Sequence, residues 1–218
     1  NNPAGWGSNG ILLNSTLTSS NITVSNNFIS DVASQGWADV NVGDNGYGIM
    51  INNGGGYRIV ANSILLNSDQ AAATGITAAV NIAAGVATPA SIELRDNIFA
   101  STQTVGTRYG VLNSSTAGAA IFSTIDHNDY FAQNVGFLTS AQTTLGAWQT
   151  ATGQDASSLA VDPLFVTVPA PADLHHFVGH VGRVERGHRA GERADARESR
   201  RLSQGRVRIV VRRVCSDP

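Results

Sequence analysis

Two short patterns of apolar and polar residues alternate along positions 10–138. The first is a glycine followed by apolar residues and usually an asparagine, at 10–14, 48–52, 75–81 and 110–113, with a weaker copy at 136–138. The second is two polar residues followed by two apolar ones, at 26–29, 62–65, 96–99 and 128–131. Successive copies of the second pattern start 36, 34 and 32 residues apart. A repeat of this length predicts a solenoid, in which each repeat packs on its neighbours.

The residues within each repeat indicate strands. Residues 22–24 and 92–94 alternate apolar with polar side chains, as half-buried strands do. Residues 71–84 are rich in alanine, but Gly75 and several β-branched residues disfavour a helix there. Short strands joined by Asn- and Gly-rich bends predict an all-β fold, a right-handed parallel β-helix over about residues 10–166. The side chains expected to point inward are Ile22, Val24, Ile49, Ile51, Ile92, Leu94, Val111 and Ile125.

Asparagine suits the bends of such a stack. Its amide both donates and accepts hydrogen bonds, so asparagines one coil apart, about 4.8 Å, can form a ladder. It also tolerates the left-handed backbone of a sharp bend. The repeats predict a ladder of Asn26, Asn62 and Asn128, with Asp96 in the same position.

The end of the repeats carries the signals of a cap. Thr143 or Thr144 can cap a short helix whose Leu145 and Trp148 cover the open edge of the last coil. Pro163 then begins a final strand at residues 164–166, where its missing N–H costs least.

The repeats and the segment that follows them resemble known proteins. The repeats of the Asn-Asn-Phe-Ile type resemble the right-handed parallel β-helix superfamily that includes pectate lyases. Residues 148–155, 158–159 and 162–166 are similar to the end of the helix in bacterial secreted β-helix proteins, many of which have a choice-of-anchor domain. The resemblance covers roughly residues 10–174 and implies a protein that is extracellular or at the bacterial cell surface.

Composition divides the chain into two parts. Residues 1–174 hold 3 Arg, no Lys and 11 acids, a net charge of −8, and 18 Asn. Residues 175–218 hold 11 Arg and 5 acids, a net charge of +6, and no Asn. We therefore expect a β-helix domain over 1–174 and a separate, disordered tail over 175–218. So few cations in the first part disfavour nucleic-acid binding, which needs clustered Lys and Arg.

The Arg-rich tail has three interpretations. It could be a basic nucleic-acid arm, or a metal-binding cluster of His175, His176, His180 and His188, whose spacing matches no closed site. The third is a reading-frame slip near His175, because shifting residues 181–190 by one base permits the peptide SAASSAGTAL. That peptide restores the composition of the first part, which favours the slip. Sequencing the coding DNA distinguishes the three.

Several other features are expected to be absent. Cys215 is the single cysteine, so there is no intrachain disulfide and no cysteine-based zinc site. No run approaches the ~18 apolar residues of a membrane span. The chain opens at Asn1 without a signal segment, which indicates a mature form or a fragment. We expect a monomer.

The longest insertion between repeats, residues 31–47, is the first candidate binding site. Exposed Trp37 and Tyr47 could stack on sugar rings, while Asp39 and Asp44 accept hydrogen bonds from hydroxyls. Arg58 follows a run of three glycines and could reach a groove. The alternative for residues 44–46 is a simple turn.

Catalysis is a second possibility implied by the resemblance. Lyases of this superfold use an Arg or Lys base beside acids that hold calcium, and residues 1–174 offer only Arg58, Arg95 and Arg108. Arg95 is expected to pair with Asp96 at a bend. Hydrolases use clustered aspartates, for which the candidate is Asp126-His127-Asn128-Asp129. The same residues are also a copy of the repeat, which favours a structural role.

The sequence thus favours a non-catalytic module that binds an extracellular polysaccharide or serves as structure. The alternative is a polysaccharide lyase or glycoside hydrolase. No cofactor is expected, except calcium in the case of a lyase.

Overall fold

The computed structural model describes residues 7–37 and 45–165. All of them belong to the first of two compact units, Asn1–Val178, and the second unit is Gly179–Pro218. The expected domain boundary at residue 174 and the expected disordered tail lie outside the described residues.

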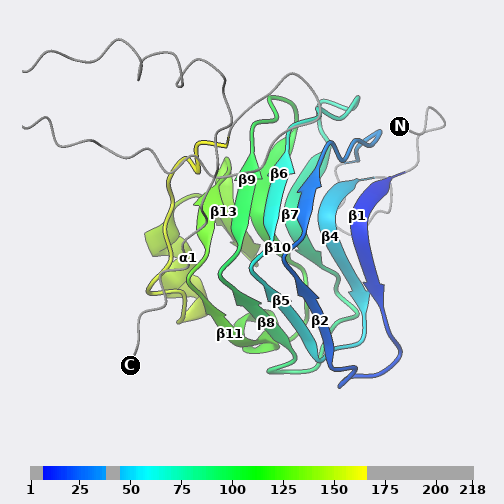
Figure 1. Cartoon of the computed structure of the whole chain (residues 1–218), viewed down its shortest axis with the longest axis vertical. Helices are drawn as coiled ribbons and strands as arrows, with labels where there is room; N and C mark the ends of the chain where they lie inside the picture. Colours follow the sequence, from blue (N-terminus) through cyan, green and yellow to red (C-terminus); the bar gives the residue numbers. More distant parts are fainter. Residues whose placement is uncertain (1–6, 38–44, 166–218) are drawn as a thin grey trace, which may run out of the picture. The chain divides into compact units, whose positions relative to one another are not determined.

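The described chain is mostly β and forms a parallel β-solenoid, as the repeats predict. Three successive strands make one coil, and each coil adds one strand to each of three sheets (Figure 1). Sheet A has the order β1-β4-β7-β10-β13-β14, sheet B β11-β8-β5-β2, and sheet C β12-β9-β6-β3. The strands pair in parallel except β13 with β14.

The strand bounds are β1 Ser8–Asn14, β2 Ile22–Ser25, β3 Phe28–Ser30, β4 Gly46–Asn53, β5 Tyr57–Val60, β6 Ser63–Leu66, β7 Ile76–Ile82, β8 Ile92–Arg95, β9 Ile98–Ser101, β10 Thr107–Asn113, β11 Phe122–Asp126, β12 Asp129–Phe131, β13 Asn134–Leu138 and β14 Ser140–Gln142. A 3-10 helix, η1, spans Gly118–Ile121, and the helix α1 spans Leu145–Thr152. Residues 76–82 of the alanine-rich stretch form β7, so the expectation that it is not helical is confirmed.

The core lies between the sheets, because alternate side chains of a strand point to opposite faces. All the predicted inward residues are buried except Ile22, which is 40 % exposed. Ile22 aligns with the buried Tyr57 and Ile92 of the next two coils. Ile22 is therefore at an inward position, as predicted, and it stays exposed because β2 is the edge strand of sheet B, with no described strand beyond it.

An asparagine ladder runs through the stack, shifted by one residue from the prediction in two coils. Its members are Asn27, Asn62, Asn97 and Asn128. The Nδ2 of each donates to the Oδ1 of the next, at 2.9, 3.0 and 3.1 Å. The residue before each of them has a positive φ of 56–57°: Asn26, Ala61, Asp96 and His127. Asn26 and Asp96 therefore make the bend and the following asparagine makes the ladder.

A helix caps the last coil, as the sequence predicts. Thr144 is the N-cap of α1, and its side chain accepts a hydrogen bond from the N–H of Ala147 at 3.2 Å. Trp148 is fully buried in the core and Leu145 packs against it.

Of the final strand expected at residues 164–166, the described part of the chain retains a single β-bridge residue, Phe165, which packs against Leu65 and Ala100. Before it, Leu159 makes a parallel bridge with Asp129. Leu164 has a φ of 49° and is 58 % exposed, so a continuous strand does not form there. Val166 lies outside the described residues.

Candidate functional site

An open groove crosses the stack at the start of the sheet B strands. Its volume is about 270 Å³. The lining residues come from four successive coils and are mostly small or polar: Ser19, Asn21, Gly56, Tyr57, Arg58, Ala90, Ser91, Glu93 and Ser123. Since neighbouring coils are about 4.8 Å apart, the groove follows the stacking direction for about 14 Å.

Charges gather on the outer face of sheet B beside this groove. Arg58 and Glu93 are register partners on β5 and β8, and their side chains point outward, between the buried residues of the same strands. Arg58 Nε lies 3.4 Å from Glu93 Oε2, and Arg95 Nε lies 2.7 Å from Glu93 Oε1. Two guanidinium groups therefore share one carboxylate, which leaves this cluster with one excess positive charge.

The expected pairing of Arg95 with Asp96 is thus wrong. Residues two apart on a strand share a face, whereas adjacent residues do not, so Glu93 lies beside Arg95 on the outer surface. Asp96 turns the chain with a φ of 57°. Ion pairs this exposed contribute little to stability, so both arginines remain suited to binding a ligand.

Ser91 adds an unusual polar group to the groove wall. It is 6 % exposed, and its hydroxyl has no hydrogen-bond partner among the residues that the structure describes. A buried hydroxyl without a partner is destabilising unless something bonds to it. The hydroxyl oxygen is itself shielded from solvent, so it lies inside the groove wall and does not face the open groove.

The structure does not gather the residues proposed in the 31–47 insertion. Trp37 is 56 % exposed, and its carbonyl accepts a hydrogen bond from the N–H of Ile76 at the start of β7. Trp37 therefore lies near the start of the sheet A strands, whereas Arg58 comes after the end of β4. The eight residues of β4 span about 23 Å and separate Trp37 from Arg58. Asp39 and Asp44 lie outside the described residues.

Tyr47 cannot stack on a sugar ring, contrary to the prediction that it is exposed. It is 1 % exposed and packs with Met50, Ala78 and Tyr109 on sheet A. Its hydroxyl accepts a hydrogen bond from Asn45 Nδ2 at 3.0 Å. Position 47 is the second residue of a long sheet A strand rather than the end of a loop, which explains its burial.

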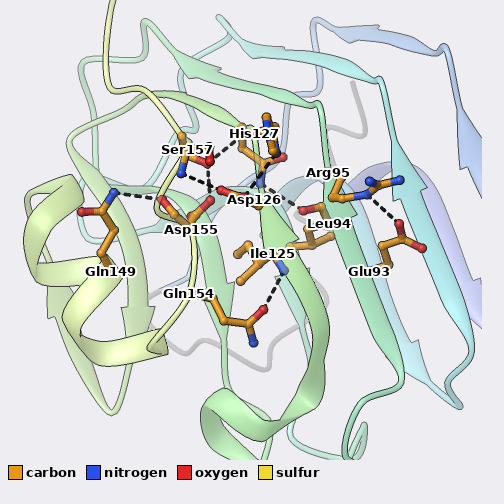
Figure 2. A network of polar contacts seen from close by, with 12 residues as sticks. Glu93, Leu94, Arg95, Ile125, Asp126, His127, Gln149, Gln154, Asp155 and Ser157 are labelled. Carbon is orange, nitrogen blue, oxygen red and sulfur yellow. Dashed lines mark hydrogen bonds and ion pairs between the residues drawn. The ribbon is translucent and has the colours of Figure 1, made fainter. Parts of the chain in front are cut away.

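Asp126 holds the chain that follows α1 (Figure 2), and Asp129 holds the same chain four residues further on. Asp126 Oδ1 accepts the N–H of Ser157 at 2.7 Å, and Asp129 Oδ1 accepts the N–H of Val161 at 3.0 Å. His127 Nδ1 lies 3.3 Å from Asp126 Oδ2. Asn128 belongs to the ladder. These contacts favour the structural interpretation of the cluster.

The electrostatics of Asp126 also disfavour a role as a general acid. Partial burial opposes ionisation, but the N–H groups of Ser157 and His127 and the nearby imidazole outweigh it and lower the pKa of Asp126 below its ordinary value. A proton donor near neutral pH needs the opposite shift.

Arg108, the last of the arginines considered for catalysis, binds within its own turn. Arg108 Nη1 donates to the carbonyl of Gly106 at 2.7 Å.

Over residues 7–37 and 45–165 there is no group of three His, Cys, Asp or Glu side chains that could hold a metal ion. No helix in the same residues is long and apolar enough to cross a membrane.

Among the predicted site residues that the structure describes (Trp37, Tyr47 and Arg58), the groove includes Arg58 alone. The sequence did not identify Ser19, Asn21, Ser91, Glu93 or Ser123, which come together only when the coils stack. Glu93 could have been found from the sequence, because the alternation at residues 92–94 places its side chain on the outer face of the strand. Comparisons with protein-family models, curated proteins and solved structures each gave no match to this chain.

Proposed function

We propose that this chain is a secreted or bacterial cell-surface β-helix module that binds a polysaccharide along the groove on sheet B. The observation that carries the proposal is the groove itself, which is open and takes residues from four successive coils. A linear polymer lying along the stacking direction would meet the same kind of polar wall at each coil.

The chemistry of the lining suits a glycan. Ser19 and Ser123 offer hydroxyl groups, and Asn21 offers an amide that both donates and accepts. Arg58 and Glu93 add a charged donor and a charged acceptor, whose hydrogen bonds are stronger than those between neutral groups. Sugar hydroxyls donate and accept as well, so they complement this wall.

The described residues favour binding over catalysis. Asp126 and Asp129 hold the segment after α1, and the lowered pKa of Asp126 makes it a poor proton donor. Glycoside hydrolysis requires an acid and a second carboxylate on either side of one bond. Glu93 is the acid of the groove, and each of its oxygens already contacts an arginine.

A panel of polysaccharides tests the proposal by affinity gel electrophoresis, with parallel assays for unsaturated and reducing ends. Arg58→Gln should weaken binding roughly tenfold or more, because a hydrogen bond from a charged group is lost. Arg108→Gln is the matched control, since its guanidinium bonds to its own turn and lies outside the groove lining. Its retardation should equal that of the unmodified protein.

Three results would redirect the assignment. Retardation that survives Arg58→Gln but is lost in Trp37→Ala would place the site at the 31–47 insertion. Release of products by the intact chain would identify a carbohydrate-active enzyme. Binding to no glycan would leave a structural role.

A further inference from the structure

The charges on the outer face of sheet B balance one another. Asp126 is the register partner of Arg95 and shares its outward orientation, since Ile125 and Leu94 beside them are buried. With Arg58 and Glu93, this gives two arginines and two acids on the face. Residues 1–174 as a whole carry a net charge of −8. Neither the face nor the sequence around it therefore offers surplus positive charge to a polyanion.

Within the groove lining, one cation stands beside one anion. Arg58 Nε lies 3.4 Å from Glu93 Oε2, and the two side chains are 56 % and 21 % exposed. The other residues of the lining are uncharged. A guanidinium only donates hydrogen bonds, and a carboxylate only accepts them. The groove thus presents a charged donor and a charged acceptor side by side.

Two adjacent hydroxyl groups of a neutral sugar complement this pair. Each hydroxyl can both donate and accept, so one can accept from Arg58 while its neighbour donates to Glu93. Hydrogen bonds in which one partner is ionised are stronger than those between neutral groups. Neither charge is then left without a partner, and the side chains of Ser19 and Asn21 remain for further hydroxyls.

A sugar carboxylate or sulfate fits this position less well. It only accepts hydrogen bonds, so it can bond to Arg58 but not to Glu93, whose like charge then lies beside it. Like charges brought together across an interface are costly and exclude unsuitable partners. The second guanidinium does not offset this cost, because Arg95 Nε is already bonded to Glu93 Oε1 at 2.7 Å.

We infer that Glu93 makes the groove selective for a neutral polysaccharide with adjacent free hydroxyl groups, against chains that carry carboxylates or sulfates. The inference rests on the proposed binding of a glycan in the groove and adds the class of glycan and the residue that selects it. One side chain supplies both a favourable contact to the bound class and a repulsive one to the excluded class, a common basis of specificity.

Oligosaccharides that share a linkage and differ in charge are the direct probes. Hexamers of β-linked glucose, β-linked mannose and α-linked galactose are each compared with the hexamer of the corresponding uronic acid. Each is titrated into the full chain, and NMR follows the side-chain Nε–H signals of Arg58 and Arg95 and the backbone amides of residues 91–93. These signals report on the groove, so acidic hexamers bound to the Arg-rich residues 175–218 are not counted.

A neutral hexamer should shift the groove signals with a Kd at least tenfold lower than that of its uronic acid counterpart, because a like charge opposes the acidic chain. Raising the ionic strength about tenfold should leave the neutral Kd unchanged and narrow the difference, since salt screens exposed charges.

The Glu93→Gln variant tests the role of the carboxylate. It removes the repulsion and releases both arginines, so the ratio of the two Kd values should move at least tenfold toward the uronic acid hexamer. Asp162→Asn is the matched control, because it removes the same charge at an exposed position outside the groove lining. Its ratio should equal that of the unmodified chain.

The outcomes separate this selectivity from glycan binding itself. Uronic acid hexamers that bind the groove as tightly as the neutral ones, or an unchanged ratio in Glu93→Gln, would overturn the selectivity and leave polysaccharide binding in place. An equal change of the ratio in Asp162→Asn would assign the selectivity to overall charge and overturn the role of Glu93. Groove signals that no hexamer shifts would overturn glycan binding in the groove, and the selectivity with it.

Discussion

The indole Nε1–H of Trp148 donates to Asp155 Oδ2 at 2.8 Å, and this bond joins α1 to the segment that closes the last coil. The same buried carboxylate accepts hydrogen bonds from the hydroxyls of Tyr130 and Ser158. Donors from α1, from β12 of the last coil and from the segment after α1 thus converge on one side chain, which makes Asp155 central to capping the solenoid.

Replacing Asp155 by asparagine should lower the free energy of unfolding by about 2–4 kcal/mol. Asparagine tolerates the φ of 70° at this position, so the loss reports the carboxylate rather than the backbone. An amide has one acceptor oxygen, and its NH₂ group faces the donors of the cap. Urea denaturation measures the change.

Asp162→Asn is the matched control for this change. Asp162 is exposed, so its substitution should alter stability by no more than about 0.5 kcal/mol. Equal effects of the two substitutions would contradict the role assigned to Asp155.

Stability should fall at alkaline pH because of Tyr130. Burial, and then the negative charge of Asp155, raise the pKa of Tyr130 well above its ordinary value of 10.0. The folded chain therefore keeps this proton at pH values where the unfolded chain loses it. The resulting stabilisation is fully present below pH 10 and is lost as the pH rises through the native pKa, with a slope of up to about 1.4 kcal/mol per pH unit.

The Tyr130→Phe variant tests this dependence by denaturation at a series of pH values. The variant should be less stable at neutral pH, because the hydrogen bond to Asp155 is lost, and should show a shallower decline above pH 10. Identical slopes in both proteins would assign the alkaline transition to other groups.

The ladder should be more sensitive in its middle than at its first described member. Asn97→Ala removes the acceptor of both Asn62 donors and leaves the carbonyl of Ile59 without its amide partner, all in a buried site. We expect a loss of about 2–4 kcal/mol. Asn27→Ala, where no coil among the described residues depends on the side chain and water can reach the site, should cost about 1 kcal/mol. Thermal and urea denaturation of the pair provide the comparison.

The bend before the ladder offers a stabilising change. Ala61 has a φ of 57°, a conformation that asparagine or glycine adopts more readily than alanine, and its side chain is exposed. Ala61→Asn should therefore raise the free energy of unfolding by about 0.5–1 kcal/mol. Ala73→Asn, at an exposed position without a positive φ, should give no gain. A loss of stability in Ala61→Asn would show that the residues around this bend accommodate alanine better than the larger asparagine side chain.

Ser91→Ala should separate stability from binding. Removing a buried hydroxyl that lacks a partner should leave stability unchanged or raise it by up to about 1 kcal/mol. The same change should leave retention on the polysaccharide that binds the intact chain unchanged, because the hydroxyl is shielded from the groove. Weakened retention would show that the groove rearranges to expose Ser91 when it binds.

Much of the fold was predictable because it depends on local and periodic signals. The alternation at residues 92–94 places Ile92 and Leu94 inward, since a strand has a period of two. Thr144 caps α1 through a bond to a residue three positions later, and Trp148 is the aromatic side chain of that short helix. These patterns lie within a few residues of one another, so they can be read from the sequence without knowing how the coils align.

The alignment of coils was less predictable, because their lengths differ. The ladder residues are 35, 35 and 31 positions apart, so a repeat read as two polar residues followed by two apolar ones cannot tell which polar residue stacks. Asn62 and Asn128 were correct, while Asn26 and Asp96 proved to be the bends before Asn27 and Asn97. Hydrogen bonds between coils make this one-residue choice.

The sequence by itself therefore determined a parallel stack of coils with a helical cap, because these depend on periodicity and on short-range capping. Tertiary structure alone decided which side chains meet. Ser19, Arg58, Ser91 and Ser123 form one groove only because stacking brings residues about 35 positions apart to within a coil spacing. It also buried Tyr47 and exposed Ile22, since burial depends on what covers a residue as well as on the residue itself.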